Sequence, residues 1–138
     1  MKGVELHIVE ASNEKELETV FASLASLQAA ALVVGADPFF NTRRSQIVAL
    51  AARHSVPAIY EWREFVDAGG LISYGPSLTG VYRQIGTYVG RILSGEKPAD
   101  LPVVQPTLFD LVVNLKTAKT LSLAVPPVIL ARADEVVE

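Results

Sequence analysis

The sequence predicts an α/β fold in which a mostly parallel β-sheet carries helices on both faces. Short apolar runs of strand length alternate with segments of helical spacing along the first 95 residues, which is the pattern of repeated β-α units. The run AALVVG at residues 30–35 is apolar throughout, as is typical of a parallel strand covered on both faces. Half of the 138 residues are apolar and a fifth are charged, so the chain can form one core.

The first β-α unit is predicted from alternation and capping. Residues 4–9 alternate apolar and polar side chains, which predicts a strand. Asn13 and Glu16 have the spacing of a capping box, and the helical periodicity that follows extends to about Gln28. The apolar stripe of this helix requires a sheet beneath it.

The second unit consists of the strand at 30–35, a loop at 37–41 and a helix at 42–54. The loop is predicted because Pro38 disfavours helical geometry at Asp37. Asn41 is expected to cap the helix. Its inner face is expected to contain Ile47, Leu50, Ala51 and His54.

Two further units follow in the same order. They comprise a strand at 56–60, a short helix at 61–66 ended by Gly69 and Gly70, a strand at 71–74 and a helix at 78–93. The inner stripe predicted for the last helix consists of Val81, Ile85, Tyr88, Val89 and Ile92, with Gly95 as its C-terminal signal.

The C-terminal part, from residue 96 onward, has a different sequence pattern. Prolines interrupt residues 96–106, which predicts a crossing segment, and a strand at 109–115 and a short helix at 116–121 come next. Pro126 and Pro127 are expected to begin a last helix that continues through Val136. We therefore divide the single unit 1–138 into core β-α units at 1–95 and a crossover, strand and helix at 96–138.

Composition and motifs exclude several functions. The net charge of −3 argues against a nucleic-acid surface, and the absence of cysteine with only two distant histidines, His7 and His54, argues against a metal site. The sequence has no Walker, GxGxxG or GxSxG motif, so we expect no cofactor, no catalytic residue and no enzymatic activity. The first residues do not form a signal peptide, and no run approaches membrane-spanning length, so the chain as written is expected to stay in the cytoplasm.

Candidate binding residues lie where the predicted strands end. In open α/β sheets ligands bind outside the carboxyl ends of the strands, so these segments are expected to share one rim. The candidates are Asp37, Pro38, Phe39, Tyr60, Glu61, Trp62, Tyr74, Gly75 and Ser77.

Each kind of candidate has a binding explanation and a structural one. Asp37 could receive an ammonium group, or it could be a turn residue before proline. Trp62 could stack on a ligand or seal the edge of the sheet, and Glu61 could accept from a donor or favour the next helix through its dipole. Ser77 lies where a helix N-terminus could hold an anion, or it could simply cap that helix.

The segment GADPFFNTRRSQIVALAARHSVPAIYEWREFVDAGGLISYGPS, together with GVYRQIGTYVGRILSGEKPADLPVVQPT, FDLVVNLKTAKTL and VPPVILARADEVVE, resembles the ABC-transporter substrate-binding proteins of the tryptophan/tyrosine-binding type. The resemblance covers essentially the whole chain. It implies the type I periplasmic binding protein fold, in which two α/β lobes joined by three crossovers close on a small ligand and deliver it to a membrane permease. It further implies a periplasmic protein that binds an amino acid or a related molecule.

The resemblance also assigns roles. Asp37, Tyr60, Glu61, Tyr74 and Gly75 look like ligand contacts of the second lobe. Compared with the family pattern, the sequence is expected to lack the first lobe and to begin at the second strand of the second lobe. In a flavodoxin-like order 2-1-3-4-5 the missing strand is central, so residues 4–9 and the strand near 31 must pair directly or another segment must fill the gap.

Unpaired parallel edges favour association, which predicts a homodimer. The strand at 109–115 or the last helix is a candidate for exchange between the two copies. A half-cleft loses much of the contact that closure provides, so the chain alone is expected to bind its ligand weakly or not at all. The alternative to a binding lobe is a stand-alone regulatory or enzymatic domain of flavodoxin-like topology.

Overall fold

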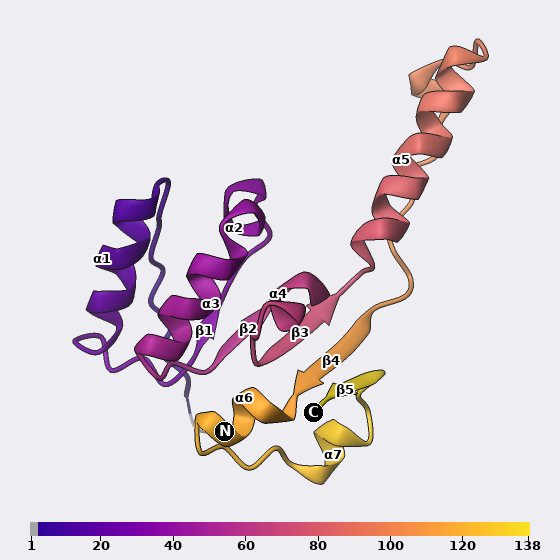
Figure 1. Ribbon diagram of the computed structural model, residues 1–138. Helices are drawn as coiled ribbons and strands as arrows, with labels where there is room; N and C mark the ends of the chain where they lie inside the picture. Colours follow the sequence, from indigo (N-terminus) through magenta and orange to yellow (C-terminus); the bar gives the residue numbers. More distant parts are fainter. Residues whose placement is uncertain (1–2) are drawn as a thin grey trace.

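The computed structural model describes residues 3–138 as a five-stranded sheet flanked by helices (Figure 1). The strands are, in sheet order, β1 (Leu32–Val33), β2 (Ala58–Tyr60), β3 (Ile72–Gly75), β4 (Asp110–Asn114) and β5 (Glu135–Val137). All neighbours pair in parallel except β3 and β4, which are antiparallel. The predicted α/β fold with a mostly parallel sheet is confirmed.

One helix precedes β1, and the others occupy the connections between the strands. They are α1 (Glu14–Leu24), α2 (Pro38–Thr42), α3 (Arg44–Arg53), α4 (Arg63–Asp67), α5 (Leu78–Leu93), the 3-10 helix η1 (Pro98–Asp100), α6 (Leu115–Thr120) and α7 (Pro127–Leu130). None of the helices in residues 3–138 is long and apolar enough to cross a membrane.

The capping box predicted for α1 is present in a shifted form. The Asn13 side chain accepts a hydrogen bond from the Glu16 N–H at 3.0 Å, while the Glu16 carboxylate accepts from the Ser12 N–H at 2.7 Å. Helix α1 ends at Leu24, four residues earlier than predicted, because turns follow and Gln28 has a left-handed φ of 52°.

The prediction of a loop at 37–41 is wrong, because Pro38 is the first residue of α2. Asp37 caps this helix, and proline is favoured at a first helical position because it has no N–H that would need a partner. Asn41 therefore lies inside α2 and does not cap the next helix. A break at Arg43, with φ −102° and ψ 14°, separates α2 from α3.

The prediction of a strand at 4–9 is also wrong. These residues are extended coil, and Val4, Leu6 and Ile8 are 94%, 78% and 81% exposed. The expectation that β1 is covered on both faces fails as well, since β1 is the edge strand of the sheet and Val33 is 75% exposed. Both differences have one cause: among the described residues, nothing pairs with the outer edge of β1.

The core lies between the sheet and the helices α1, α3 and α4. Its most completely buried apolar side chains include Phe21, Ile47, Leu50, Val66, Val112 and Val113. The inner face predicted for the second helix is largely confirmed: Ile47, Leu50 and Ala51 are buried, and His54 is half-buried with its ring 6.1 Å from that of Phe21.

Helix α5 has the predicted bounds, but it does not bury the predicted stripe. It projects from the sheet with η1 (Figure 1), and we call residues 78–104 the arm. Ile85, Val89 and Ile92 are 51%, 49% and 39% exposed. The returning segment lies against the helix, since the Tyr88 hydroxyl donates to the Pro102 carbonyl at 2.6 Å.

The prediction of a last helix through Val136 is wrong. Helix α7 is a single turn, and Glu135–Val137 forms β5, which pairs with β4. Two side chains hold β5 in place: the Asp134 carboxylate accepts from the Leu111 N–H at 2.8 Å, and the Glu135 carboxylate accepts two hydrogen bonds from Arg63. Tertiary contacts with α4 and β4 therefore override the local helical pattern.

Candidate functional site

The parallel strands β1, β2 and β3 end at one edge of the sheet, as the sequence predicts. Their register pairs Val33 with Ile59 and Tyr60 with Ser73, so the segments that follow them emerge together. We call the residues in these segments, together with Phe109, which directly precedes the neighbouring β4, the strand-end rim: Asp37–Phe40, Glu61–Trp62, Tyr74–Ser77 and Phe109.

Asp37 is exposed at the rim and held in one orientation. One carboxylate oxygen accepts a hydrogen bond from the Phe39 N–H at 2.7 Å, which makes Asp37 the cap of α2. The second oxygen makes no hydrogen bond with the described residues. A fixed carboxylate with a free oxygen is suited to an ammonium or another donor, so the capping role of Asp37 is compatible with the binding role predicted for it.

The rim segments that follow β1 and β2 also contain three aromatic side chains. Phe39, Phe40 and Trp62 are half-buried and pack against the core, and the two phenylalanine rings are 5.7 Å apart. Pro38 starts the helix that carries the phenylalanines. These rings give the rim an apolar floor while leaving part of each side chain exposed.

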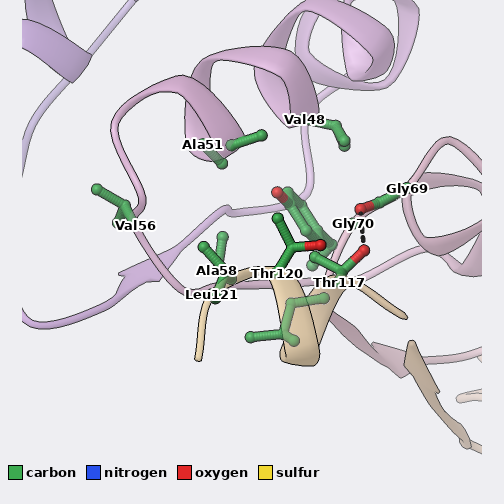
Figure 2. A pocket seen from close by; sticks show the side chains of 12 residues that line it. Val48, Ala51, Val56, Ala58, Gly69, Gly70, Thr117, Thr120 and Leu121 are labelled. Carbon is green, nitrogen blue, oxygen red and sulfur yellow. Dashed lines mark hydrogen bonds between the residues drawn. The ribbon is translucent and has the colours of Figure 1, made fainter. Parts of the chain in front are cut away.

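Tyr60 is the candidate that the structure does not bring to the rim. Its side chain is 2% exposed and stacks on Phe65 with a ring separation of 4.6 Å. It lines a hollow of about 30 Å³ between α3 and α6, where Figure 2 shows Val48 and Ala51 facing Thr117 and Leu121. Burial raises the pKa of Tyr60 to about 12. The ring is therefore a core group whose backbone alone reaches the rim.

Gly75, at the end of β3, lies against the loop that follows β2. A Cβ at this position would collide with the Glu61 carbonyl oxygen and would lie 2.8 Å from the Glu61 Cγ. Only glycine allows the loop after β2 to approach β3 this closely. Glu61 is consequently held beside the end of β3, with its side chain half-buried.

Tyr74 and Phe109 form an aromatic pair that the sequence analysis missed in part. Tyr74 is 56% exposed and Phe109 44% exposed, and their rings stack at 5.6 Å with an angle of 27°. The antiparallel register, which pairs Tyr74 with Leu111 and Gly75 with Asp110, brings Phe109 to the rim. The sequence signal was an aromatic residue at the start of the predicted strand 109–115, but its partner depends on strand order.

Ser77 has a structural role. Its hydroxyl oxygen accepts a hydrogen bond from the Gly80 N–H at 3.3 Å and caps α5. That oxygen is therefore engaged by the helix, and the arm begins at the next residue.

The rim combines two carboxylates with exposed aromatic faces in an open arrangement. Such groups suit a small molecule that carries both a positive charge and a flat apolar part. None of four hollows found among residues 3–138 is lined by Asp37, Glu61 or Tyr74, whereas one of them, beside α1 and β1, is lined in part by the rim residue Phe40. The described residues contain no group of three or more His, Asp or Glu side chains that could hold a metal ion.

Open α/β sheets bind ligands at the edge where the rim lies, and the chain has the architecture of that class. The family model for ABC transporter substrate binding protein matches residues 1–137, and the chain therefore belongs to this family. This confirms the resemblance read from the sequence motifs. A comparison with curated proteins gave no match.

Three solved structures share the fold. They are a conserved domain protein from Vibrio cholerae (TM-score 0.80, 23% identity, 88% of this chain and 41% of that chain), the ABC domain in complex with L-Trp from Streptococcus pneumonia (0.74, 23%, 89% and 41%), and the ligand-free, open form of a substrate binding protein with adhesive properties from Clostridium difficile (0.60, 22%, 92% and 42%). This chain thus spans about two fifths of the length of each.

Proposed function

We propose that this chain is a solute-binding lobe of an ABC uptake transporter and that it contacts an amino acid or a related small molecule at the strand-end rim. The observation that carries the proposal is the family match over residues 1–137. The complex of one structural neighbour with L-Trp supports a ligand of this class, because the aromatic and acidic side chains of the rim fit an aromatic ammonium compound.

In this proposal Asp37 and Glu61 accept from the ammonium group of the ligand, and the pair Tyr74 and Phe109 contacts its apolar part. Pro38, Phe39, Trp62, Gly75 and Ser77 shape the surface around these contacts. The buried Tyr60 supports the rim from below through its stack on Phe65. We propose no catalytic step and no cofactor.

The partners follow from the family. Substrate binding proteins of ABC transporters act outside the cytoplasmic membrane and deliver their ligands to a permease, and we propose the same for the lobe described here. Because a single open rim buries less of a ligand than two closing lobes, we propose that the chain alone binds weakly.

The test is a ligand titration followed by NMR and calorimetry, using L-tryptophan, L-tyrosine and L-leucine as probes. We expect shifts of the Tyr74 and Gly75 amides with a dissociation constant of about 0.1–10 mM, an affinity of roughly 3–5 kcal/mol. Asp37→Asn should abolish these shifts while preserving the cap, because asparagine caps helices as well as aspartate does. Asp100→Asn, which removes a charge from η1, is the matched control and should leave them unchanged.

Two results would count against the proposal. Submicromolar binding by the chain alone would contradict the open half-cleft. Shifts that avoid the rim with every probe, or that survive Asp37→Asn unchanged, would remove the assignment of the site.

We also propose that two copies associate through the arm. Its exposed stripe of Ile85, Val89 and Ile92 is apolar, and burial of such a stripe against a symmetric copy would remove it from water. Exchange of the strand at 109–115 is less well supported, since Val112 and Val113 are 1% and 0% exposed within their own chain.

A further inference from the structure

The hollow of about 30 Å³ between α3 and α6 lies apart from the rim, because none of the residues that line it belongs to the rim. Its walls come from α3, β2, the turn after α4, and α6 (Figure 2). Three of its side chains, those of Tyr60, Thr117 and Thr120, carry hydroxyl groups, and the other lining residues are apolar or glycine. The hollow is therefore a mostly apolar chamber with three polar groups.

The Tyr60 hydroxyl has no hydrogen-bond partner among the described residues, in which the one bond from a tyrosine hydroxyl is that of Tyr88 on the arm. The Tyr60 side chain is 2% exposed, and its ring is held between the stack on Phe65 and the backbone of Gly70, where an added Cβ would lie 2.7 Å from the ring. Burial raises the pKa of Tyr60 to about 12, so at neutral pH the hydroxyl keeps its proton and is a donor. A buried phenol normally has a hydrogen-bond partner, because an unmade bond leaves the desolvation of the hydroxyl uncompensated.

The two threonine hydroxyls have used their protons but can still accept. The Thr117 hydroxyl donates to the Gly69 carbonyl at 2.8 Å, a bond drawn in Figure 2. The Thr120 hydroxyl donates to the Lys116 carbonyl at 3.0 Å. Because a hydroxyl oxygen has two acceptor positions, each of these oxygens can accept a further bond. The lining therefore offers one donor and two acceptors to an occupant of the hollow.

Both the volume and this set of groups match one water molecule. A buried water requires a hollow of at least about 10–15 Å³ and typically makes about three hydrogen bonds to groups that otherwise lack partners. Its oxygen can accept from Tyr60, and its two protons can be donated to the threonine oxygens. Pockets that hold organic ligands have volumes of about 300–1,000 Å³, roughly ten times larger or more. An apolar occupant would leave the Tyr60 hydroxyl without a partner.

We propose that this hollow is a binding site for one buried water molecule, which accepts a hydrogen bond from the Tyr60 hydroxyl and donates to Thr117 or Thr120. The water then links β2 to α6, two elements that belong to different parts of the chain. Because Tyr60 directly precedes Glu61, the link also supports the strand end that leads into the rim. The proposal does not depend on the solute-binding function, since the lining and the rim share no residue.

A high-resolution crystal structure of the full chain locates the water. We expect a density peak about 2.6–3.0 Å from the Tyr60 Oη and within hydrogen-bond distance of a threonine hydroxyl. Tyr60→Phe removes the donor but keeps the ring that stacks on Phe65, and the peak should be lost in this variant.

Oxygen-17 magnetic relaxation dispersion tests the site in solution, because it detects long-lived waters and does not respond to exchanging hydroxyl protons. We expect Tyr60→Phe to lower the amplitude of the dispersion by the contribution of about one water molecule. Tyr82→Phe is the matched control, since it removes the same atom from an exposed tyrosine on α5 and should leave the amplitude unchanged. NMR spectra establish that both variants are folded, and the crystal structure of the original chain is a test that needs no variant.

The proposal is overturned if the hollow of the original chain contains no density, or if the Tyr60 hydroxyl bonds a protein carbonyl instead. It is also overturned if folded Tyr60→Phe has the same oxygen-17 amplitude as the original chain, because the water would then not depend on the phenol. Density longer than one water molecule would assign the hollow to another class of ligand.

Discussion

At the scale of single residues, the geometry of the rim depends on a close approach of two backbone segments as much as on polar side chains. Asp37 serves its own helix with one oxygen and presents the other, so its orientation does not depend on a ligand. Gly75 has no side chain to contribute, yet the position of Glu61 depends on it. The side chain of Tyr60 points into the core because side chains alternate between the two faces of β2, and this burial raises the pKa of its hydroxyl.

Gly75→Ala should destabilise the chain. The added methyl collides with the Glu61 backbone, which cannot move without separating β2 from β3, so the free energy of unfolding in urea should fall by about 2–3 kcal/mol. Gly86→Ala is the matched control, because nothing lies within 4 Å of a Cβ at that helical position. It should raise the unfolding free energy by about 0.5–1 kcal/mol through helix propensity. Equal effects of the two changes would contradict the close approach.

Tyr60 should make the stability depend on alkaline pH. Its pKa is raised from 10.0 to about 12 in the folded chain because burial disfavours the phenolate. The unfolded chain therefore loses this proton first, and the contribution to stability, fully present below pH 10, is lost as the pH rises toward 12. The unfolding free energy of Tyr60→Phe should fall less over this range, by about 2 kcal/mol, in denaturant titrations at several pH values. Identical pH profiles would show that the phenol is accessible to solvent.

At the scale of elements, local signals decide where the longer helices begin, whereas tertiary contacts decide the conformation of the shortest elements. The N-terminal caps of α1 and α5 act through hydrogen bonds within three residues, so they are effective wherever the helix lies. Short elements such as α7 and β5 have weak local signals, and long-range bonds to Leu111 and Arg63 decide their conformation.

Asn13→Ala should weaken α1. It removes the acceptor for the Glu16 N–H, and the unfolding free energy should fall by about 1 kcal/mol in urea denaturation. Asn13→Ser retains a capping oxygen and should lose only a small part of that stability. An alanine variant as stable as the original would mean that packing of Leu17, Phe21 and Leu24 alone holds the helix.

At the scale of the whole molecule, two surfaces remain uncovered in the described residues, namely the apolar stripe of the arm and the outer edge of β1. They lie on different elements and have different chemistry. The arm offers apolar side chains on a helix, whereas the edge of β1 offers backbone groups of a strand. A partner for one surface therefore need not satisfy the other.

Ile85→Glu should abolish self-association through the arm. We expect the original chain to show a concentration-dependent mass in light scattering that approaches a dimer, and the variant to remain a monomer, because a carboxylate in the stripe opposes burial. Thr87→Glu adds the same charge on another face of α5 and should still dimerise. A monomeric mass of the original chain at all concentrations would contradict the homodimer.

Much of the fold could be predicted because its signals are local. The order of the elements from β1 to α5, the bounds of α5 and the left-handed Gly69 and Gly95 all follow from periodicity and glycine placement. The location of the rim follows too, since parallel strands end at the same edge. The pairing of Tyr74 with Phe109, however, joins residues 35 positions apart and depends on which strands are neighbours.

The amino-acid sequence by itself determined the α/β class, the order of most elements, the family motifs and the residues near the strand ends, because each of these depends on short-range periodicity, capping or chain order. Tertiary structure decided that residues 4–9 do not pair, that Tyr60 faces inward, that α5 projects, and that the last residues form a strand. Those outcomes depend on which surface lies next to each segment. A strand forms only where another backbone accepts its hydrogen bonds, and a stripe is buried only where a second surface covers it.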